Sequence, residues 1–552
     1  MSKNLLMKNL DKYKNLKHDI PSGLVVFLVA LPLCLGIALA SGAPMFSGII
    51  AGIVGGIIVG AISGSPLGVS GPAAGLAVIV ADSIVDLGTN AAGEFDITAG
   101  FQAFLVAGVI AGILQLFLAV FKAGIIGYYF PSSVIKGMLA GIGITLILKQ
   151  IPHAFGMNKN PTGDWSYYEI DNAHFFSDII YSMSHFSVGA IIITLVSLGI
   201  LILFQRPFIK KQAILRLIPG PLLAVLVAVI LNELFVLTAP HLVLNNEFVE
   251  LGGQQVSNSH LVDIKAADAS QPYFGLLTFP DWSVLSNPKI YLIGFTLTVV
   301  ASLETLLSVA ATDKLDPYKR STPTNRELFA QGTGNVISSL IGGLPITQVV
   351  VRSSTNISAG GRTKMAAIVH GIFLTAFVLA LPAVLNMIPL SVLAAILLFV
   401  GYQLAKISLF KEVYKQGLSQ FLPFILTIIV IIAVNLLWGI IAGFIVAVFY
   451  ILKRSYQNGM YSKFTKNDAK VTIQLGEVVS FFNKGNLHKK FDEIDENSEV
   501  VIDGSINKHL DYDIIDLIDD FRHSAKSRNI NVIVIGFDIH NDLNDTSPLK
   551  NN

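Results

Sequence analysis

The stretch GSPLGVSGPAAGLAVIVAD, residues 64–82, interrupts with glycines and prolines a part of the chain that is otherwise apolar enough to cross a bilayer. Backbone that is not helical is tolerated at membrane depth only where it is buried in protein or lines a cavity. Pro72 suits the first turn of a helix, so the residues after it predict a half-helix that runs to Asp82. We therefore expect a crossing made of an extended piece followed by a half-helix.

The composition is that of an integral membrane protein. Of the 552 residues, 53% are hydrophobic and 14% are charged, and the mean hydropathy is +0.65. The net charge of +1 gives no indication of nucleic acid as a partner. The single cysteine, Cys34, excludes an internal disulfide and a cysteine-rich metal site.

Apolar runs recur between residues 24 and 452, and their lengths predict about 12 to 14 crossings. Short basic clusters alternate with longer, more acidic connections near residues 86–100, 150–184 and 238–288. Because basic residues favour the cytoplasmic side, an arrangement of 14 spans with both termini inside places all basic clusters together. This predicts a multi-pass membrane protein with both termini in the cytoplasm.

Both ends of the chain differ from this apolar part. Residues 1–19 combine lysines with apolar residues at helical spacing and predict an amphipathic cytoplasmic segment. The alternative is a cleavable signal peptide that ends near ALASGA, residues 38–43. Residues 465–540 alternate strand-like and helix-like runs, which predicts a small cytoplasmic α/β domain, and a polar tail, residues 541–552, follows.

A second interrupted segment, GGLPITQVVVRSSTNISAGGRTK, occupies residues 342–364 in the other half of the chain. Glycine and proline again precede a short extended run, and a half-helix is expected from about Val351. Two interrupted spans in corresponding halves indicate an inverted-repeat transporter with its binding site between them. The unpaired N–H groups at two facing half-helix N-termini would form an anion site.

Two charged residues accompany these half-helices. An arginine near the membrane centre is unfavourable by about 2.5–3.5 kcal/mol, so Arg352 either shapes the potential of the anion site or pairs with a carboxylate. Glu304 is the expected partner for such a pair and also the leading candidate for binding a coupling ion. Ser308, one turn later, would supply a second oxygen, or would bond back to its own helix.

Other polar residues carry weaker predictions. The segment TNREL, residues 324–328, is interpreted as the start of a helix. His370 has no second ligand at metal spacing and is interpreted as a packed, hydrogen-bonded residue. No metal is expected beyond a Na+ at Glu304, and no cofactor. Neither paired carboxylates nor a nucleophile and base at catalytic spacing occur, so the chain is not expected to be an enzyme.

The motifs resemble those of the SulP anion transporters, the bacterial relatives of solute carrier family 26. The matching pieces are ALPLCLGIALASGAP, GVSGPAAG, SLETLLSVAATD, TNRELFAQGTGNVISSLIGGLP and VVVRSSTNISAGGRTK. The resemblance covers about residues 20–455 as a transport domain, and the C-terminal domain resembles a STAS domain. It implies an all-α polytopic fold of 14 spans in two inverted repeats of seven. It also implies a core domain (spans 1–4 and 8–11) that moves like an elevator against a gate domain (spans 5–7 and 12–14).

The resemblance also implies a set of site residues. Gly71, Ala73 and Ala74 would offer N–H groups to the anion from the third span, and Glu304 matches the family's acidic position in the eighth. The tenth span would offer the N–H groups of Val351, Arg352 and Ser353, and the first span would contribute Leu33 and Ile37.

The implied substrate is a small inorganic anion, with bicarbonate favoured and sulfate next. Leu33 stands where many sulfate-type members have glutamine, and PITQVVVRSSTNI is similar to members associated with carbonic anhydrases. Sodium-coupled bicarbonate carriers have aspartate at the position of Glu304, so both Na+ and H+ remain candidates for coupling. The alternatives are a proton-coupled sulfate or dicarboxylate transporter, and, from another class, a passive anion channel or a transporter-derived sensor. A homodimer and a soluble partner such as a carbonic anhydrase are expected.

Overall fold

The computed structural model describes residues 2–90, 93, 95–125, 130–156, 186–206, 209, 219–244, 246–251, 254–262, 277–458, 461–467 and 470–537. The predicted polar tail, residues 541–552, lies outside the described residues, as does most of the connection expected at 150–184. The chain divides into two compact units, Met1–Gly443 and Phe444–Asn552, with the boundary inside one long helix.

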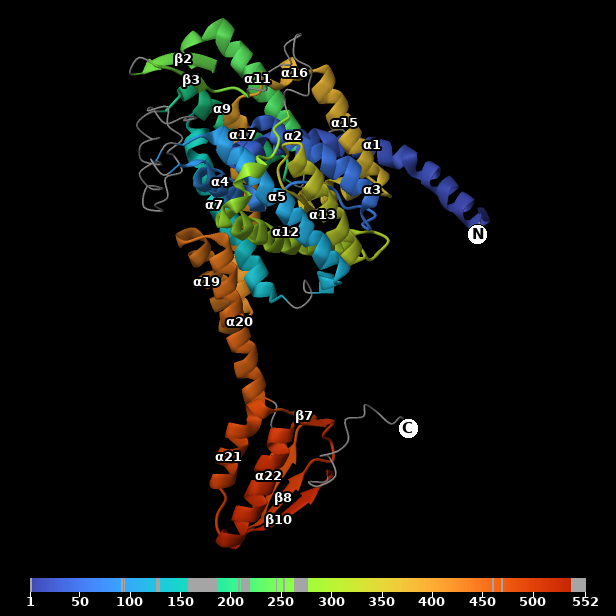
Figure 1. The fold of residues 1–552 in the computed structure, drawn as a ribbon, viewed down its shortest axis with the longest axis vertical. Helices are drawn as coiled ribbons and strands as arrows, with labels where there is room; N and C mark the ends of the chain where they lie inside the picture. Colours follow the sequence, from blue (N-terminus) through green and yellow to red (C-terminus); the bar gives the residue numbers. More distant parts are fainter. Residues whose placement is uncertain are drawn as a thin grey trace. The chain divides into compact units, whose positions relative to one another are not determined.

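The first unit contains two series of helices that follow the same order (Figure 1). The first series is α1 (Ser2–Ala40), α2 (Met45–Val54) continued by a π-turn (Gly55–Val59) into α3 (Gly60–Ile62), β1 (Ser70–Pro72) with α4 (Ala77–Gly88), α5 (Ile97–Val120), α7 (Ser132–Ala154), α9 (Val188–Leu203) and α11 (Gly220–Thr238). A hairpin of β2 (Asn246–Leu251) and β3 (Gln254–Ser259) follows.

The second series repeats this order. It consists of α12 (Pro288–Leu315), α13 (Thr324–Leu340), β4 (Ile346–Gln348) with α14 (Val350–Ser358), α15 (Met365–Ala380), α17 (Leu390–Leu404), α19 (Leu418–Ala433) and α20 (Leu436–Asn458), with short helices α16 (Pro382–Leu385) and α18 (Ile407–Lys415) between. In each series the third crossing is a strand followed by a short helix. The predicted 14 spans in two repeats of seven are confirmed.

Hydropathy alone detects fewer of these crossings. Eight of the described helices are long and apolar enough to span a membrane, and α9, α15 and α19 are shorter apolar helices. The half-helices α4 and α14 are too short, and α13 carries too many polar residues. These interrupted or polar crossings lie next to the candidate site.

Helix packing follows the two expected groups, and α1 joins them through further contacts with α17 and α11. Helices α5, α12 and α13 pack together, and α1 packs against α2, α14 and α15. Helices α7, α9, α17 and α19 form the other group, with α11 against α9. Glycines on α2 and on the π-turn that follows it permit the close contacts of the first group. A Cβ at Gly56 would lie 2.8 Å from the Cα of Gly371 on α15.

The second unit contains the predicted α/β domain. Its sheet has the order β10 (Asn531–Ile535), β8 (Glu499–Asp503), β6 (Lys470–Leu475), β5 (Tyr461–Asn467). Strand β8 runs parallel to both neighbours, whereas β5 is antiparallel to β6. Helices α21 (Lys484–Asp492) and α22 (Tyr512–Ala525) bury Leu487, Ile514 and Ile518 in a core with Val471 and Ile502.

Two segments differ from their predicted bounds. Residues 1–19 do not form a separate helix, because α1 continues without a break from Ser2 to Ala40. The first half-helix passes Asp82 and ends at Gly88, and Asp82 forms an ion pair with Lys149 at 2.8 Å. The start of α13 at Thr324 confirms the helix predicted from TNREL.

Candidate anion-binding site

The two interrupted crossings meet at a short antiparallel ladder between β1 and β4. Ser70 pairs with Gln348, Gly71 with Thr347, and Pro72 with Ile346, and all six residues are buried. Each strand leads within a few residues into its half-helix, and the antiparallel pairing is what inverted repeats produce. The N-termini of the half-helices therefore lie at the two ends of one three-pair ladder.

The N-terminus of α14 is open. Its first turn offers the N–H groups of Val350, Val351 and Arg352, because a helix leaves its first N–H groups without partners inside the helix. Val350 and Val351 are 36% and 42% exposed, so protein does not cover this end. Ser353 differs from the prediction, since its N–H already donates to the Val349 carbonyl at 3.0 Å.

The Ser353 side chain instead connects the two crossings. Its hydroxyl donates to the Val349 carbonyl at 2.8 Å and accepts from the Val69 N–H at 3.0 Å. Ser353 thus joins the start of α14 to the residue before β1.

The N-terminus of the first half-helix is occupied by a carboxylate. Ala73 is extended and is followed by a 3-10 turn, Ala74–Leu76, which leads into α4. The N–H of Gly75 donates to the carboxylate of Glu304 on α12, whose Oε2 is buried and has no hydrogen-bond partner. A Cβ at Gly75 would lie 2.9 Å from this Oε2, so glycine permits the approach. Because the N-terminus of a helix favours negative charge, Glu304 lies where an anion would also be attracted.

Arg352 is fully buried and does not pair with Glu304. Its Nη2 donates to the Sγ of Cys34 on α1 at 3.3 Å, while Nε and Nη1 have no hydrogen-bond partner among the described residues. Nη1 lies against Gly71, where a Cβ would overlap it. The salt bridge considered as an alternative is therefore not formed. The guanidinium occupies the space that the missing Gly71 side chain leaves behind β1.

The remaining predicted residues lie nearby but show no further polar contact with the half-helices. Leu33 and Ile37 are buried on α1, and Leu33 belongs to an apolar core cluster. Ser308 is buried one turn after Glu304, and its carbonyl accepts from the Thr312 hydroxyl at 2.7 Å. The prediction that His370 is hydrogen-bonded is wrong, because both ring nitrogens are buried without a partner.

Sequence reasoning did not identify a group of buried polar side chains around the ladder. Gln348 Nε2 donates to the Thr312 hydroxyl at 3.1 Å and so connects β4 to α12. The Oγ1 atoms of Thr305 and Thr347 are buried without a partner. All of them lie inside the motifs SLETLLSVAATD and PITQVVVRSSTNI, but those motifs do not show that these side chains surround the ladder.

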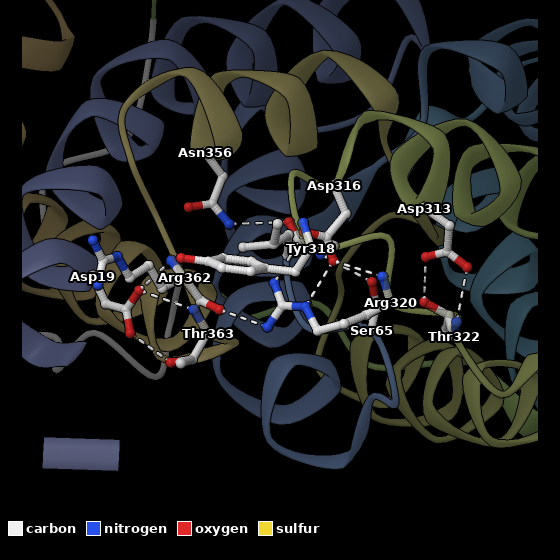
Figure 2. Close-up of polar contacts among 12 residues, drawn as sticks. Asp19, Ser65, Asp313, Asp316, Tyr318, Arg320, Thr322, Asn356, Arg362 and Thr363 are labelled. Atoms are coloured by element: carbon white, nitrogen blue, oxygen red, sulfur yellow. Dashed lines mark hydrogen bonds and ion pairs between the residues drawn. The ribbon is translucent and has the colours of Figure 1, made fainter. Parts of the chain in front are cut away.

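A cluster of polar residues holds the far end of α14 (Figure 2). Asp19 at the start of the apolar part of α1 accepts from the N–H groups of Arg362 and Thr363 at 2.7 and 3.0 Å. Arg320 donates to Asp316 at 2.7 Å and to the Arg362 carbonyl at 2.9 Å. We call Asp19, Asp316, Arg320, Arg362 and Thr363 the turn cluster, because they join the turns after α12 and α14 to α1.

Asp316 carries a shifted pKa. Burial of its carboxyl favours the neutral form, but hydrogen bonds from Arg320 and from the Tyr318 N–H, with the charge of Arg320, outweigh burial and lower the pKa below its usual value. The carboxylate is therefore ionised and bonded at neutral pH.

A comparison with known protein families identifies the chain. The model of the sulfate permease family matches residues 16–429. The chain belongs to this family. The resemblance to the SulP transporters is thereby confirmed, and the chain is a multi-pass membrane protein of an anion-transporter family.

Individual members of the family are distant in sequence. YvdB of Bacillus subtilis, provisionally named a sulfate transporter, is 24% identical over 450 residues, which cover 81% of this chain and 75% of YvdB. The bicarbonate transporter BicA of Picosynechococcus is 24% identical over 463 residues, covering 84% of this chain and 75% of BicA. These relatives are transporters and not enzymes, which confirms the prediction that the chain is not an enzyme.

Solved structures share the fold. The transmembrane domain of a cyanobacterial BicA superposes with a TM-score of 0.62 at 24% identity, over 78% of this chain and 98% of that one. The structure of SLC26A9 has a TM-score of 0.74 at 15% identity, over 98% of this chain and 90% of that one.

Proposed function

We propose that this protein is a secondary active transporter of small inorganic anions, with bicarbonate as the favoured substrate and sulfate as the next. The observation that carries the proposal is the open N-terminus of α14 with the unneutralised guanidinium of Arg352 directly behind it. Helix N–H groups and a nearby cation attract an anion without a basic side chain having to touch it.

Glu304 supplies a basis for coupling. As a carboxylate on the Gly75 N–H it occupies one of the two N-termini and repels an incoming anion. Binding of H+ or Na+ to Glu304 removes that repulsion, so anion and coupling ion favour each other's binding. The unpartnered Oε2 would carry the proton or bind the Na+, with Ser308 as a candidate second oxygen ligand.

The choice of substrate rests on relatives and on the resemblance. BicA is named as a bicarbonate transporter and YvdB as a sulfate transporter, at the same identity to this chain. The first-span motif with Leu33 favours bicarbonate, and a proton-coupled sulfate or dicarboxylate transporter is the second candidate.

The proposal has further parts that follow from family membership. The group of α1–α5 and α12–α15 would move like an elevator against the group of α7, α9, α11, α17, α19 and α20. Both termini would be cytoplasmic in the bacterial inner membrane. The C-terminal α/β unit would act as a STAS-like domain that supports a homodimer or binds a soluble partner such as a carbonic anhydrase.

The test is uptake of labelled bicarbonate and, separately, labelled sulfate into proteoliposomes with a Na+ gradient, a pH gradient or neither. Gradient-driven uptake of either anion supports a secondary transporter, and the effective gradient identifies the coupling ion. Uptake of both anions that no gradient influences would favour the channel, and no uptake of either would contradict both.

Glu304→Gln assigns the coupling role. Glutamine keeps an oxygen for the Gly75 N–H but neither ionises nor binds a cation as strongly. We expect gradient-driven accumulation to be lost in this variant. Asp313→Asn is the matched control on the same helix, because Asp313 bonds only with the backbone and hydroxyl of Thr322 in the described structure. Loss of coupling in both variants would contradict a specific role of Glu304 in coupling.

A further inference from the structure

A row of buried polar side chains lies along α13, and neither the anion nor the coupling ion accounts for it. Glu327, Gln331 and Asn335 follow one another at four-residue spacing, and none is more than 3% exposed. Buried polar groups are unfavourable unless they are hydrogen-bonded, above all in a membrane protein. Their partners therefore indicate what the row does.

The first two members of the row hold β1. The Glu327 carboxylate accepts from the Ser63 hydroxyl at 2.5 Å and from two backbone N–H groups that follow Ser63. Gln331 Nε2 donates to Glu327 at 2.9 Å and to the hydroxyl of Ser70, the first residue of β1, at 2.8 Å. Gln331 therefore fixes β1 to α13, and Glu327 fixes the turn before it.

The third member holds β4. Asn335 Oδ1 accepts from the Ile346 N–H at 2.5 Å, and its Nδ2 donates to the Ile346 carbonyl at 3.1 Å. The amide thus bonds to both backbone groups of one strand residue, as a neighbouring strand would. Nδ2 also donates to Gln115 on α5 at 2.7 Å, which fixes the orientation of the amide.

The spacing of helix and strand explains why these residue positions are used. Gln331 and Asn335 are about one helical turn apart, or about 6 Å along α13. Ser70 is paired with Gln348, which lies two residues, or about 7 Å, along β4 from Ile346. One turn of α13 therefore spans the ladder, with Gln331 at one end and Asn335 at the other.

We propose that Gln331 and Asn335 are positioning residues that fix the register of the β1–β4 ladder and thereby determine which size of anion the two half-helices accept. Three residue pairs are too few to hold a register by themselves. If one strand of the ladder slipped by one residue, its side chains would turn to the opposite face of the ladder. Gly71 would then no longer lie against the guanidinium of Arg352. The selectivity part of this inference rests on the proposed transport function.

Asn335→Ala tests the inference in the full-length protein. The variant leaves both backbone groups of Ile346 without their side-chain partner, and we expect faster amide hydrogen exchange in residues 342–350. We also expect the ratio of the KM values for bicarbonate and sulfate to change by about fivefold or more, because an unsatisfied buried group shifts an equilibrium by at least that factor. A role in stability alone would lower the amount of folded protein and leave this ratio unchanged.

Thr333→Val is the matched control on the same helix. Its hydroxyl bonds only to the Phe329 carbonyl at 2.9 Å in the described structure, and it faces away from the row. Neither exchange nor the KM ratio should change. An unchanged KM ratio in a folded Asn335→Ala protein, or unchanged exchange, would overturn the proposal.

Ser70→Ala decides the question if Asn335→Ala does not fold. It removes a single acceptor for Gln331 and changes little volume. We expect a smaller change of the same KM ratio, and an unchanged ratio would overturn the proposal. If the wild-type protein carries neither anion, the proposed transport function fails. Faster amide hydrogen exchange in the variants would then still support the role in fixing the register, and unchanged amide hydrogen exchange would contradict it.

Discussion

The two half-helices share a backbone design but differ in chemistry. Both follow a strand of the same ladder, yet Glu304 bonds to the N-terminus of α4 whereas the first turn of α14 is exposed. The guanidinium that lies against Gly71 of the ladder belongs to Arg352 of α14. The two repeats thus provide two N-termini, and in the proposed function single residues assign one to the coupling ion and the other to the anion.

The largest effect is expected from Arg352→Ala. The charge of Arg352 attracts an anion at α14 by about 2 kcal/mol if they are about 8 Å apart at an effective dielectric of 20. Its loss should raise the KM of the transported anion roughly 30-fold. Measurement of KM and maximal uptake rate in proteoliposomes checks this. Arg320→Ala, which removes a basic residue of the turn cluster, is the control. Equal effects of the two variants on KM would contradict a specific role of Arg352 at the N-terminus of α14.

Gly71→Ala should have an intermediate effect on affinity. The new methyl group would overlap Nη1 of Arg352, and the flexible arginine can move away while the backbone is retained. We expect the KM to rise by a few-fold, roughly 3–10-fold, because the charge moves and is not removed. Coupling to the ion gradient should stay intact, and a loss of coupling would show that the two N-termini do not act separately.

Gly75→Ala is the corresponding change at α4. Its methyl group would lie within 3.0 Å of all three atoms of the Glu304 carboxylate group and would displace it from the helix N-terminus. We expect weaker coupling, measured as less accumulation per imposed gradient, with a smaller change in KM than in Gly71→Ala. The same substitution four residues apart thus separates affinity from coupling, and identical profiles of the two variants would contradict the assignment.

The sequence predicted the architecture better than the contacts. Glycine and proline in residues 64–82 and 342–364 predicted both half-helices, because few other residues are placed at such breaks. The partners of Arg352 and Glu304 could not be predicted, since each contact depends on a side chain that is distant in sequence. Cys34 is 318 residues from Arg352, and Gly75 belongs to the other repeat from Glu304.

Helix bounds were predicted less well where tertiary contacts decide them. The first half-helix was expected to end at Asp82, but α4 continues to Gly88, and Asp82 forms an ion pair with Lys149 on α7. Ser353 was expected to offer its N–H, but the helix starts one residue earlier than expected and uses it. The row on α13 lies inside the motif TNRELFAQGTGNVISSLIGGLP, but its role could not be predicted from the sequence because it depends on the ladder beside it.

The smallest effect is expected at the C-terminal ends of the half-helices, where α4 and α14 also differ from each other. The end of α14 is fixed by the buried carboxylates of the turn cluster, whereas α4 carries the more exposed pairs Asp82–Lys149 and Asp86–Lys289. Asp316→Asn should lower the melting temperature in detergent by a few degrees, since one charged hydrogen bond is lost.

Because the folded pKa of Asp316 is lowered, its stabilisation is present above the unfolded value of about 3.9 and is lost as pH falls through the folded value. The difference between wild type and variant should therefore be present near pH 7 and shrink below about pH 4. Asp86→Asn, as the matched change at α4, should alter the melting temperature less, and an equal or larger effect there would contradict the difference between the two ends.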